Sequence, residues 1–211
     1  MTPPVLFGAE YSVYSRIARL ALIEKGAAHE MRNVDVFAPG GPDADHLSRH
    51  PFGRIPVLEH HGFRLYEASA IARYADEAFP GPALQPATAQ GRARMAQVVS
   101  MLDCYAFRPL VLDIFVQRVA AAPDEARIAS ALGAARIVLG ELARFLRDGD
   151  FLAGAALSLA DLHAAPMLAY FRLAPEGAAM LDEHPGLAAW LARMRARPSM
   201  DQTLFPRERA A

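Results

Sequence analysis

The segment Ser158-Leu-Ala-Asp161 has the residue types and spacing of a capping box at the start of a helix. In such a box a serine hydroxyl and a carboxylate three residues later satisfy backbone N–H groups that the first turn leaves without partners. Leu157 and Leu162 stand where the two apolar residues of a hydrophobic staple would pack. Ser158, Asp161 and His163 also supply the residue types of a catalytic triad. Residues three and five positions apart on one helix turn do not form the required line of nucleophile, base and orienting acid, so we interpret the segment as structural.

Histidines in the first third of the chain raise the question of a metal site. His46 and His50 stand four residues apart, and His60 and His61 follow. Zinc sites usually need three or four rigidly held ligands. Pro51 ends the predicted helix directly after His50, and no carboxylate or thiolate completes a recognisable set. We therefore expect no metal.

The segment HPFGRIPVLE, residues 50–59, places a proline inside a run that otherwise resembles a β-strand. Proline has no N–H to donate to a strand ladder, so Pro56 conflicts with a regular strand. A cis Ile55–Pro56 bond at a strand edge resolves the conflict, because it turns the Ile55 backbone outward, where it can pair with something other than the sheet. An ordinary edge-strand proline is the alternative.

The elements around these residues change character near residue 80. Up to that point, short apolar strands alternate with helical patterns: strands at Val5–Phe7 and 55–59, a hairpin into Phe63–Tyr66, and helices at 13–26 and from Glu67. This order predicts a small α/β layer built on a βαβ unit. After Pro86 the pattern is helical, with predicted helices at 88–121 (bent at Pro109), from Pro123 to Leu146, from Ser158, and after His184 with Trp190. We expect an α/β domain at 1–80 and an all-α bundle at 88–211.

Composition limits the classes of function. Of the 211 residues 53% are hydrophobic and 21% charged, with 22 basic against 23 acidic side chains. This balance supports an ordinary core and gives no electrostatic reason to expect a nucleic-acid partner. The single cysteine, Cys104, excludes a disulfide framework and fits a reducing compartment. No apolar run approaches the ~18 residues of a membrane span, and the N-terminus lacks the pattern of a secretory signal, so we expect a soluble, cytoplasmic protein.

Motifs for other enzyme classes are absent from the sequence. It contains no Gly-x-Gly-x-x-Gly, no phosphate-binding loop and no Gly-x-Ser-x-Gly elbow. These absences remove the usual dinucleotide, nucleotide and hydrolase interpretations.

Four motifs, in order and over essentially the whole chain, resemble the cytosolic glutathione transferases. They are YSVYSRIARLALIEKG, PFGRIPVLE, LYEASAIARYADEAF and FLAGAALSLADLHAAPMLAYF. The resemblance is closest to the serine-type groups, in particular to phi-like bacterial members. It implies a thioredoxin-like N-terminal domain, a helical C-terminal domain, and glutathione as co-substrate for attack on a small electrophile.

The resemblance assigns the catalytic hydroxyl to Ser12, which aligns through Glu24-Lys25-Gly26 with the serine of the phi-like group. A free thiol has a pKa of roughly 8.5, so only a few per cent is thiolate at neutral pH. A hydroxyl donor at a helix N-terminus would stabilise the thiolate. Ser12 also suits a plain N-cap, and both roles can hold together. Tyr11, Tyr14 and Ser15 are the alternative hydroxyls, whereas the tyrosine-type position is occupied by Phe7.

Glutathione binding follows from the same alignment. Arg54 stands where the family holds peptide or carboxylate groups, and the Ile55 backbone would pair with the cysteinyl part in the manner of an added strand. Glu67 would meet the γ-glutamyl ammonium. The hydroxyl that usually receives the γ-glutamyl carboxylate is missing at Ala68, which leaves its backbone N–H, and Ser69 points about 100° away on a helix.

Two further departures accompany Ala68. The basic residue that phi-like members carry before the second helix falls on Gly41-Pro42. No cysteine lies near Ser12, so omega-like or beta-like thiol chemistry has no nucleophile. Both Ala68 and the missing basic residue predict modest glutathione affinity.

The second half supplies the predicted electrophile pocket and part of a predicted homodimer interface. Met101, Tyr105, Arg108 and Leu112 share a helix face, from which we select Tyr105 and Arg108 as pocket walls, with packing of the bundle as the alternative. Family members are two-fold dimers. Apolar and arginine side chains suited to a reciprocal interface are Phe63, Arg73, Arg92 and Arg94.

Two other functions stay open. A glutathione-binding protein of the same fold with little catalysis is compatible with Ala68. A glutathione-dependent isomerase is the narrower option, because residues 12–19 loosely resemble the Ser-Ser-Cys-Ser-x-Arg-x-Arg start of zeta-like enzymes. Val13 and Tyr14 break that pattern.

Overall fold

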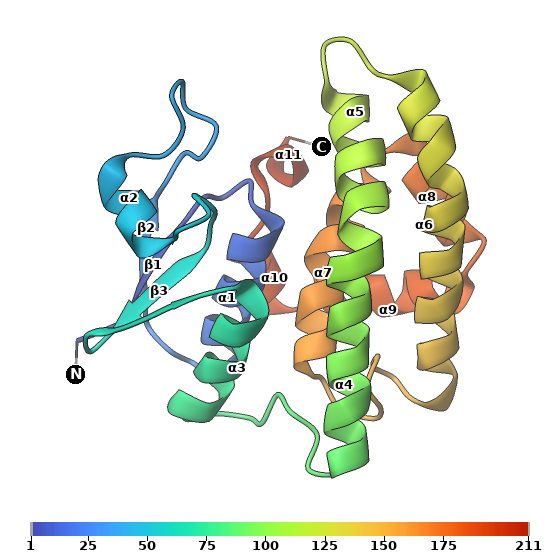
Figure 1. Ribbon diagram of the computed structural model, residues 1–211. Helices are drawn as coiled ribbons and strands as arrows, with labels where there is room; N and C mark the ends of the chain where they lie inside the picture. Colours follow the sequence, from blue (N-terminus) through green and yellow to red (C-terminus); the bar gives the residue numbers. More distant parts are fainter. Residues whose placement is uncertain (1, 211) are drawn as a thin grey trace. The chain divides into compact units, whose positions relative to one another are not determined.

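The computed structural model describes residues 2–210, apart from the side chain of Asp148, as a sheet with helices followed by a helical bundle (Figure 1). Packing divides the chain into two compact units. One comprises Met1–Ala83 together with Pro198–Ala211, and the other is Leu84–Arg197. The domain boundaries expected from the sequence, 1–80 and 88–211, stay a prediction, but the packing places the C-terminal segment with the first unit.

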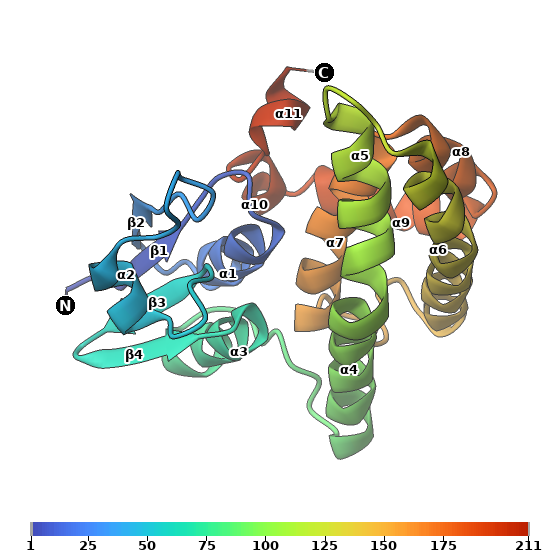
Figure 2. The same cartoon turned by 45° about the horizontal axis from the view of Figure 1, so that its top comes forward.

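The sheet of the first unit has four strands, visible in Figure 2: β1 (Val5–Gly8), β2 (Glu30–Asn33), β3 (Val57–His60) and β4 (Phe63–Tyr66). Their spatial order is β2-β1-β3-β4. β1 pairs parallel with β2 and antiparallel with β3, and β3 pairs antiparallel with β4. The hairpin and the thioredoxin-like α/β class are confirmed. The strands predicted at Val5–Phe7 and 55–59 correspond to β1 and β3, although β3 begins at Val57, and the sequence indicated no bounds for β2.

Helices α1 (Val13–Glu24), α2 (Ala44–Arg49) and α3 (Ala68–Ala78) complete this layer, and α1 packs against α3. The predicted stop of α1 is confirmed: Lys25 is its C-cap, and Gly26 follows with a φ of 66°. The buried Lys25 Nζ donates to Asp76 Oδ1 at 3.0 Å and to the Pro82 carbonyl at 2.9 Å. This lysine therefore joins the end of α1 to α3 and to the segment that follows it.

The C-terminal segment also packs on α1, through α10 (Pro198–Asp201) and α11 (Pro206–Arg209). Arg16, 1% exposed, pairs with Glu208 at 2.5 Å and lies over the Phe205 ring at 4.3 Å. Neither helix was predicted from the sequence, in which the last predicted helix is the one that holds Trp190. Four-residue helices carry too few apolar positions to show a period.

The second unit is helical: α4 (Ala89–Met101), a π-helix η1 (Leu102–Phe115), α5 (Val116–Val119), α6 (Glu125–Phe145), the 3₁₀ turn η2 (Leu146–Asp148), α7 (Leu159–Arg172), α8 (Pro175–Asp182) and α9 (Pro185–Arg195). In Figure 1, α4, η1 and α5 follow one another along a single rod. Pro109 lies inside η1. Proline has no backbone N–H, and a π-type i→i+5 hydrogen-bond pattern is one way in which a helix accommodates this missing donor. No helix within residues 2–210 is long and apolar enough to cross a membrane.

The predicted capping box forms at the start of α7. The fully buried Asp161 carboxylate accepts from Ser158 N–H at 2.9 Å, Ser158 Oγ at 2.8 Å, Leu152 N–H at 2.8 Å and Trp190 Nε1 at 2.9 Å. Burial raises the pKa of Asp161, and these four donors act against that shift. His163 instead donates from Nε2 to Asp103 at 2.7 Å, in agreement with the rejection of a triad.

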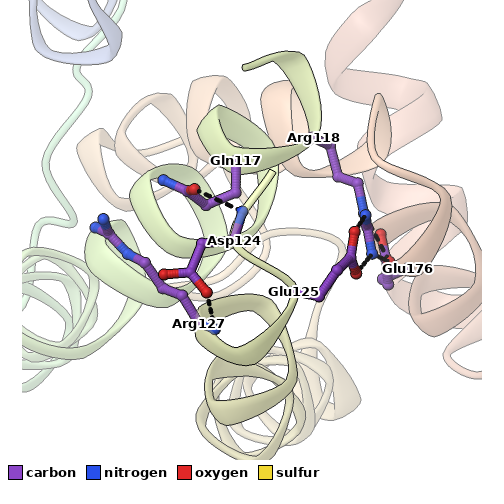
Figure 3. A network of polar contacts seen from close by, with 6 residues as sticks. All are labelled: Gln117, Arg118, Asp124, Glu125, Arg127 and Glu176. Atoms are coloured by element: carbon purple, nitrogen blue, oxygen red, sulfur yellow. Dashed lines mark hydrogen bonds and ion pairs between the residues drawn. The ribbon is translucent and has the colours of Figure 1, made fainter. Parts of the chain in front are cut away.

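A network of charged and polar side chains connects α5, α6 and α8 at one end of the bundle (Figure 3). The Arg118 guanidinium makes two bonds to Glu125, at 2.5 and 2.9 Å, and also binds Glu176 of α8. Asp124 caps α6 by accepting from Arg127 N–H at 3.0 Å. Paired carboxylates on both sides raise the pKa of Arg118, so this arginine is a permanent cationic bridge between α5, α6 and α8.

Candidate active site

Three backbone segments meet at one end of the sheet in the first unit. Phe7 of β1 pairs with Val57 of β3, and Val57 pairs with Tyr66 of β4. The loop after β1, the residues before β3 and the residues after β4 therefore lie at the same end. These are the segments that carry Ser12, Arg54–Ile55 and Glu67–Ala68, so the fold brings together the residues predicted for thiol chemistry and for glutathione binding.

Ser12 is the N-cap of α1. Its backbone is extended (φ −85°, ψ 123°), and its Oγ accepts from Ser15 N–H at 3.1 Å. The side chain is half-buried. No acidic residue stands in the first turn of α1, so the positive end of the helix has no carboxylate of its own there. The predicted N-cap role is confirmed, and the catalytic role stays a prediction.

The other hydroxyls near Ser12 have different surroundings. Tyr11 donates to Asp35 Oδ1 at 3.3 Å, and burial together with that carboxylate raises the pKa of Tyr11. Ser15 is fully buried and its Oγ accepts from Ala9 N–H at 3.3 Å. It also lies so close to Gly8 that a Cβ there would stand 2.5 Å from Ser15 Oγ. Ser15 is therefore enclosed in the fold, whereas Ser12 keeps an accessible surface.

Arg54 and Ile55 immediately precede β3. The Ile55–Pro56 bond is cis, as predicted. The Arg54 side chain is exposed, while its carbonyl accepts from Nε2 of the buried His46 at 2.8 Å. The cis bond and the histidine contact together define the path of this backbone as it enters the sheet.

Glu67 begins α3 with an unusual backbone. Its φ of 73° lies in a region that residues other than glycine rarely occupy, at a cost of roughly 1–3 kcal/mol. Its side chain is exposed, Ala68 is buried, and Ser69 is half-buried. Neither a side-chain cap nor an acid in the first turn neutralises this helix start. Such strain often marks binding sites, and no pattern in the sequence indicated it.

The structure reveals a histidine and aromatic cluster beside Glu67 that sequence reasoning considered only as a metal site. His46 and His50 are both 2% exposed, and the His50 ring lies 4.7 Å from the Tyr66 ring. Burial lowers the pKa of His50, and the negative charge of Glu67 acts in the opposite direction by raising it. Phe52 beside it is 70% exposed. Among the described residues no group of three potential ligands is arranged for a metal ion.

The predicted pocket residues Tyr105 and Arg108 belong to η1 in the second unit. Tyr105 is 69% exposed, and Arg108 is exposed with Nε 3.4 Å from Asp113 Oδ2. Asp113 is bound more closely by Arg127, at 2.5 Å. Both predicted side chains are thus accessible in the unit that contains them, and their role as pocket walls stays a prediction.

A four-stranded thioredoxin-like unit with an open helix start at its cis-proline end, joined to a helical bundle, has the architecture of a glutathione-dependent transferase. Two family models match the chain: the glutathione S-transferase N-terminal domain over residues 6–83 and the glutathione S-transferase C-terminal domain over residues 101–198. The chain belongs to the glutathione S-transferase family.

Relatives and solved structures match over nearly the full length. The probable glutathione S-transferase GSTF1 of Oryza sativa subsp. japonica is 29% identical, covering 95% of this chain and 94% of that protein. Glutathione transferase F7 from Populus trichocarpa is 28% identical with a TM-score of 0.85, covering 95% and 97%. Glutathione S-transferase I from maize, solved with an atrazine glutathione conjugate, is 26% identical with a TM-score of 0.83, covering 96% of each chain.

Proposed function

We propose that this protein is a serine-type, phi-like transferase of the bacterial kind, which adds the glutathione thiol to a small electrophile. The observation that carries the proposal is the start of α1: a serine-capped helix end without an acid in its first turn, at the cis-proline end of the sheet. The single cysteine supports a reducing, cytoplasmic compartment. Reduced glutathione, the co-substrate, is available there.

Ser12 can serve as cap and as thiolate ligand at once, because the two roles use different parts of the hydroxyl. A lone pair of Oγ accepts from Ser15 N–H. The O–H remains to donate to a sulfur anion, and the cap contact holds Oγ in position for that bond. The exposed N-terminal amides of α1 add favourable electrostatics. In free glutathione only a few per cent of the thiol is ionised at neutral pH, and stabilising the thiolate in the site raises this fraction.

The remaining site residues would hold the tripeptide. The exposed Arg54 guanidinium suits a carboxylate or peptide oxygen, and the Ile55 backbone suits the cysteinyl peptide groups. Glu67 supplies a carboxylate for the γ-glutamyl ammonium. The backbone N–H groups of Ala68 and Ser69, at the start of α3, suit the γ-glutamyl carboxylate. The electrophile would rest on Tyr105 and Arg108, and Arg108 would favour a polar or anionic substrate.

Replacing Ser12 by alanine tests the proposal. We expect turnover to fall by one to three decades, because an anion-stabilising donor is worth about 2.7–4 kcal/mol. Thr88→Ala is the matched control: it removes the N-cap of α4, whose Oγ1 accepts from Gly91 N–H at 3.0 Å, outside the site. Steady-state conjugation of a chromogenic aryl halide is the measurement. Unchanged turnover in Ser12→Ala would move the role to Tyr11, Tyr14 or the backbone.

Ala68 favours a second candidate, a glutathione-binding protein with little catalysis. Retention on immobilised glutathione without turnover of the aryl halide would support that function. Consumption of a cis-enone without consumption of thiol would support the isomerase instead.

We also propose a homodimer. Phe63 is 49% exposed, and Arg73, Arg92 and Arg94 are exposed. Arginine stems cover apolar area and their guanidinium groups pair with carboxylates, which suits a reciprocal interface. Light scattering at low micromolar concentration should give twice the mass of one chain, and Phe63→Glu should shift it toward one. A stable unmutated monomer would contradict the dimer and leave the Ser12 chemistry untouched.

A further inference from the structure

The buried ring of His46 makes one hydrogen bond that leaves its own helix. Its Nε2 lies 2.8 Å from the Arg54 carbonyl oxygen. A carbonyl only accepts, so Nε2 carries the proton and donates. The other nitrogen, Nδ1, is buried and has no partner among the residues described. The contact thus assigns the donor role to Nε2 of this ring.

The Arg54 carbonyl shares its peptide group with the Ile55 N–H. The cis bond in this segment is the next one, Ile55–Pro56, so the Arg54–Ile55 peptide is trans. In a planar trans peptide the C=O and N–H point in opposite directions. Holding the carbonyl against His46 on α2 therefore directs the Ile55 N–H away from α2. Within residues 2–210 no hydrogen bond occupies this N–H.

We propose that His46 is a positioning residue for glutathione: it fixes the Arg54–Ile55 peptide so that the Ile55 N–H is presented to the cysteinyl part of the tripeptide. This inference rests on the proposed function. Backbone contacts around the histidine reinforce the arrangement. His50 N–H donates to the His46 carbonyl at 2.9 Å, and Gly53 N–H donates to the His50 carbonyl at 2.9 Å. These bonds fold residues 50–54 back toward the His46 ring, which binds the Arg54 carbonyl.

Two substitutions at His46 distinguish the effect of its N–H donor from the effect of the space that its ring fills. His46→Phe keeps an aromatic ring but removes the donor, and it leaves the Arg54 carbonyl without its partner. His46→Gln keeps an N–H donor at a similar reach. We expect His46→Phe to weaken glutathione binding and raise the KM for glutathione about three- to tenfold, the worth of one hydrogen bond. The kcat at saturating glutathione should change less than twofold, and His46→Gln should restore most of the affinity.

His60→Phe is the matched control. It removes a histidine contact in the same unit, Nδ1 to the Tyr74 hydroxyl at 2.8 Å, at the end of β3 away from the site. It should lower thermal stability and leave the KM for glutathione unchanged. A folded His46→Phe variant with the KM of the unmutated protein would overturn the positioning role. Failure of the unmutated protein to bind glutathione in calorimetry would overturn the proposed function itself.

A measurement on the unmutated protein covers the case in which His46→Phe does not fold. ¹⁵N-labelled protein should show a proton on Nε2 of His46, and glutathione should shift the Ile55 amide resonance. An Nε2 without a proton, or an Ile55 amide insensitive to glutathione, would overturn the proposal.

Discussion

Helices α1 and α7 both begin at a serine, yet the two helix starts are completed in opposite ways. At α7 the Asp161 carboxylate is buried and accepts four hydrogen bonds, from Ser158, Leu152 and Trp190. At α1 the first turn holds no acid, and the Ser12 hydroxyl makes the cap with Ser15 while keeping an accessible surface. One helix start is neutralised by a carboxylate of its own chain, whereas the other has no acid in its first turn, which is the property that the proposed thiolate site requires.

This difference shows how a serine-capped helix start can serve either stability or chemistry. Amide donors at a helix start attract negative charge in either case. Where the chain supplies the carboxylate, the interaction fixes a helix and its neighbours. Where the chain supplies a hydroxyl alone, a dissolved thiolate can take the same place. The start of α3, which also lacks a side-chain cap and an acid in its first turn, belongs with α1.

The largest effect on stability should follow from removing the carboxylate at the start of α7. Asp161→Ala leaves Leu152 N–H, Ser158 N–H and Trp190 Nε1 buried without their acceptor. Because each unsatisfied donor costs about 1–3 kcal/mol, we expect the free energy of unfolding to fall by about 3 kcal/mol or more. Urea unfolding followed by circular dichroism measures it. Asp161→Asn, which keeps one acceptor oxygen, should lose less. A loss below about 1 kcal/mol would contradict the role assigned to this carboxylate.

The converse experiment closes the open helix start. Ser12→Asp keeps a good N-cap residue, so stability should change by less than about 1 kcal/mol. Its carboxylate would occupy the place proposed for the thiolate and repel the sulfur anion. We expect turnover to fall at least as far as in Ser12→Ala, and the pKa of bound glutathione, followed by thiolate absorbance, to rise. Higher activity in Ser12→Asp than in Ser12→Ala would contradict an anion site at α1.

The smallest effect concerns the start of α3. Ala68→Ser restores the hydroxyl that the resemblance leads us to expect for the γ-glutamyl carboxylate. One added hydrogen bond should tighten glutathione binding several-fold in calorimetry. No gain would mean that the carboxylate is held elsewhere, and the comparison of α3 with α1 would then fail.

Local chemistry made much of this architecture predictable. The Ser158 capping box, the Gly26 stop of α1 and the 63–66 hairpin each depend on residues within a few positions of one another, and each is confirmed. The cis Ile55–Pro56 bond followed from the conflict between a proline and a strand. In each case the signal and the structure occupy the same short stretch of chain.

Other local features were not predictable, because no residue pattern marks them. The hydrogen bond from His46 to the Arg54 carbonyl joins residues eight positions apart, and histidine spacing alone indicated only a weak metal motif. The positive φ of Glu67 is imposed by the turn from β4 into α3, because glutamate has no preference for that region. The sequence predicted a bend at Pro109, and the structure places this proline inside the π-helix η1, a winding that the sequence did not indicate.

The ion pair between Arg16 and Glu208 has a consequence for how the protein is made. The two residues are 192 positions apart, and both side chains are almost wholly buried. During vectorial synthesis α1 leaves the ribosome before the second unit and α11 are translated. The Arg16 guanidinium therefore cannot pair with the Glu208 carboxylate until α11 has been synthesised. A fragment that ends at residue 83 would carry the Arg16 charge without this counter-ion. The first unit, which includes residues from both sides of the second in the sequence, can complete this buried ion pair only after the chain of the second unit has been made.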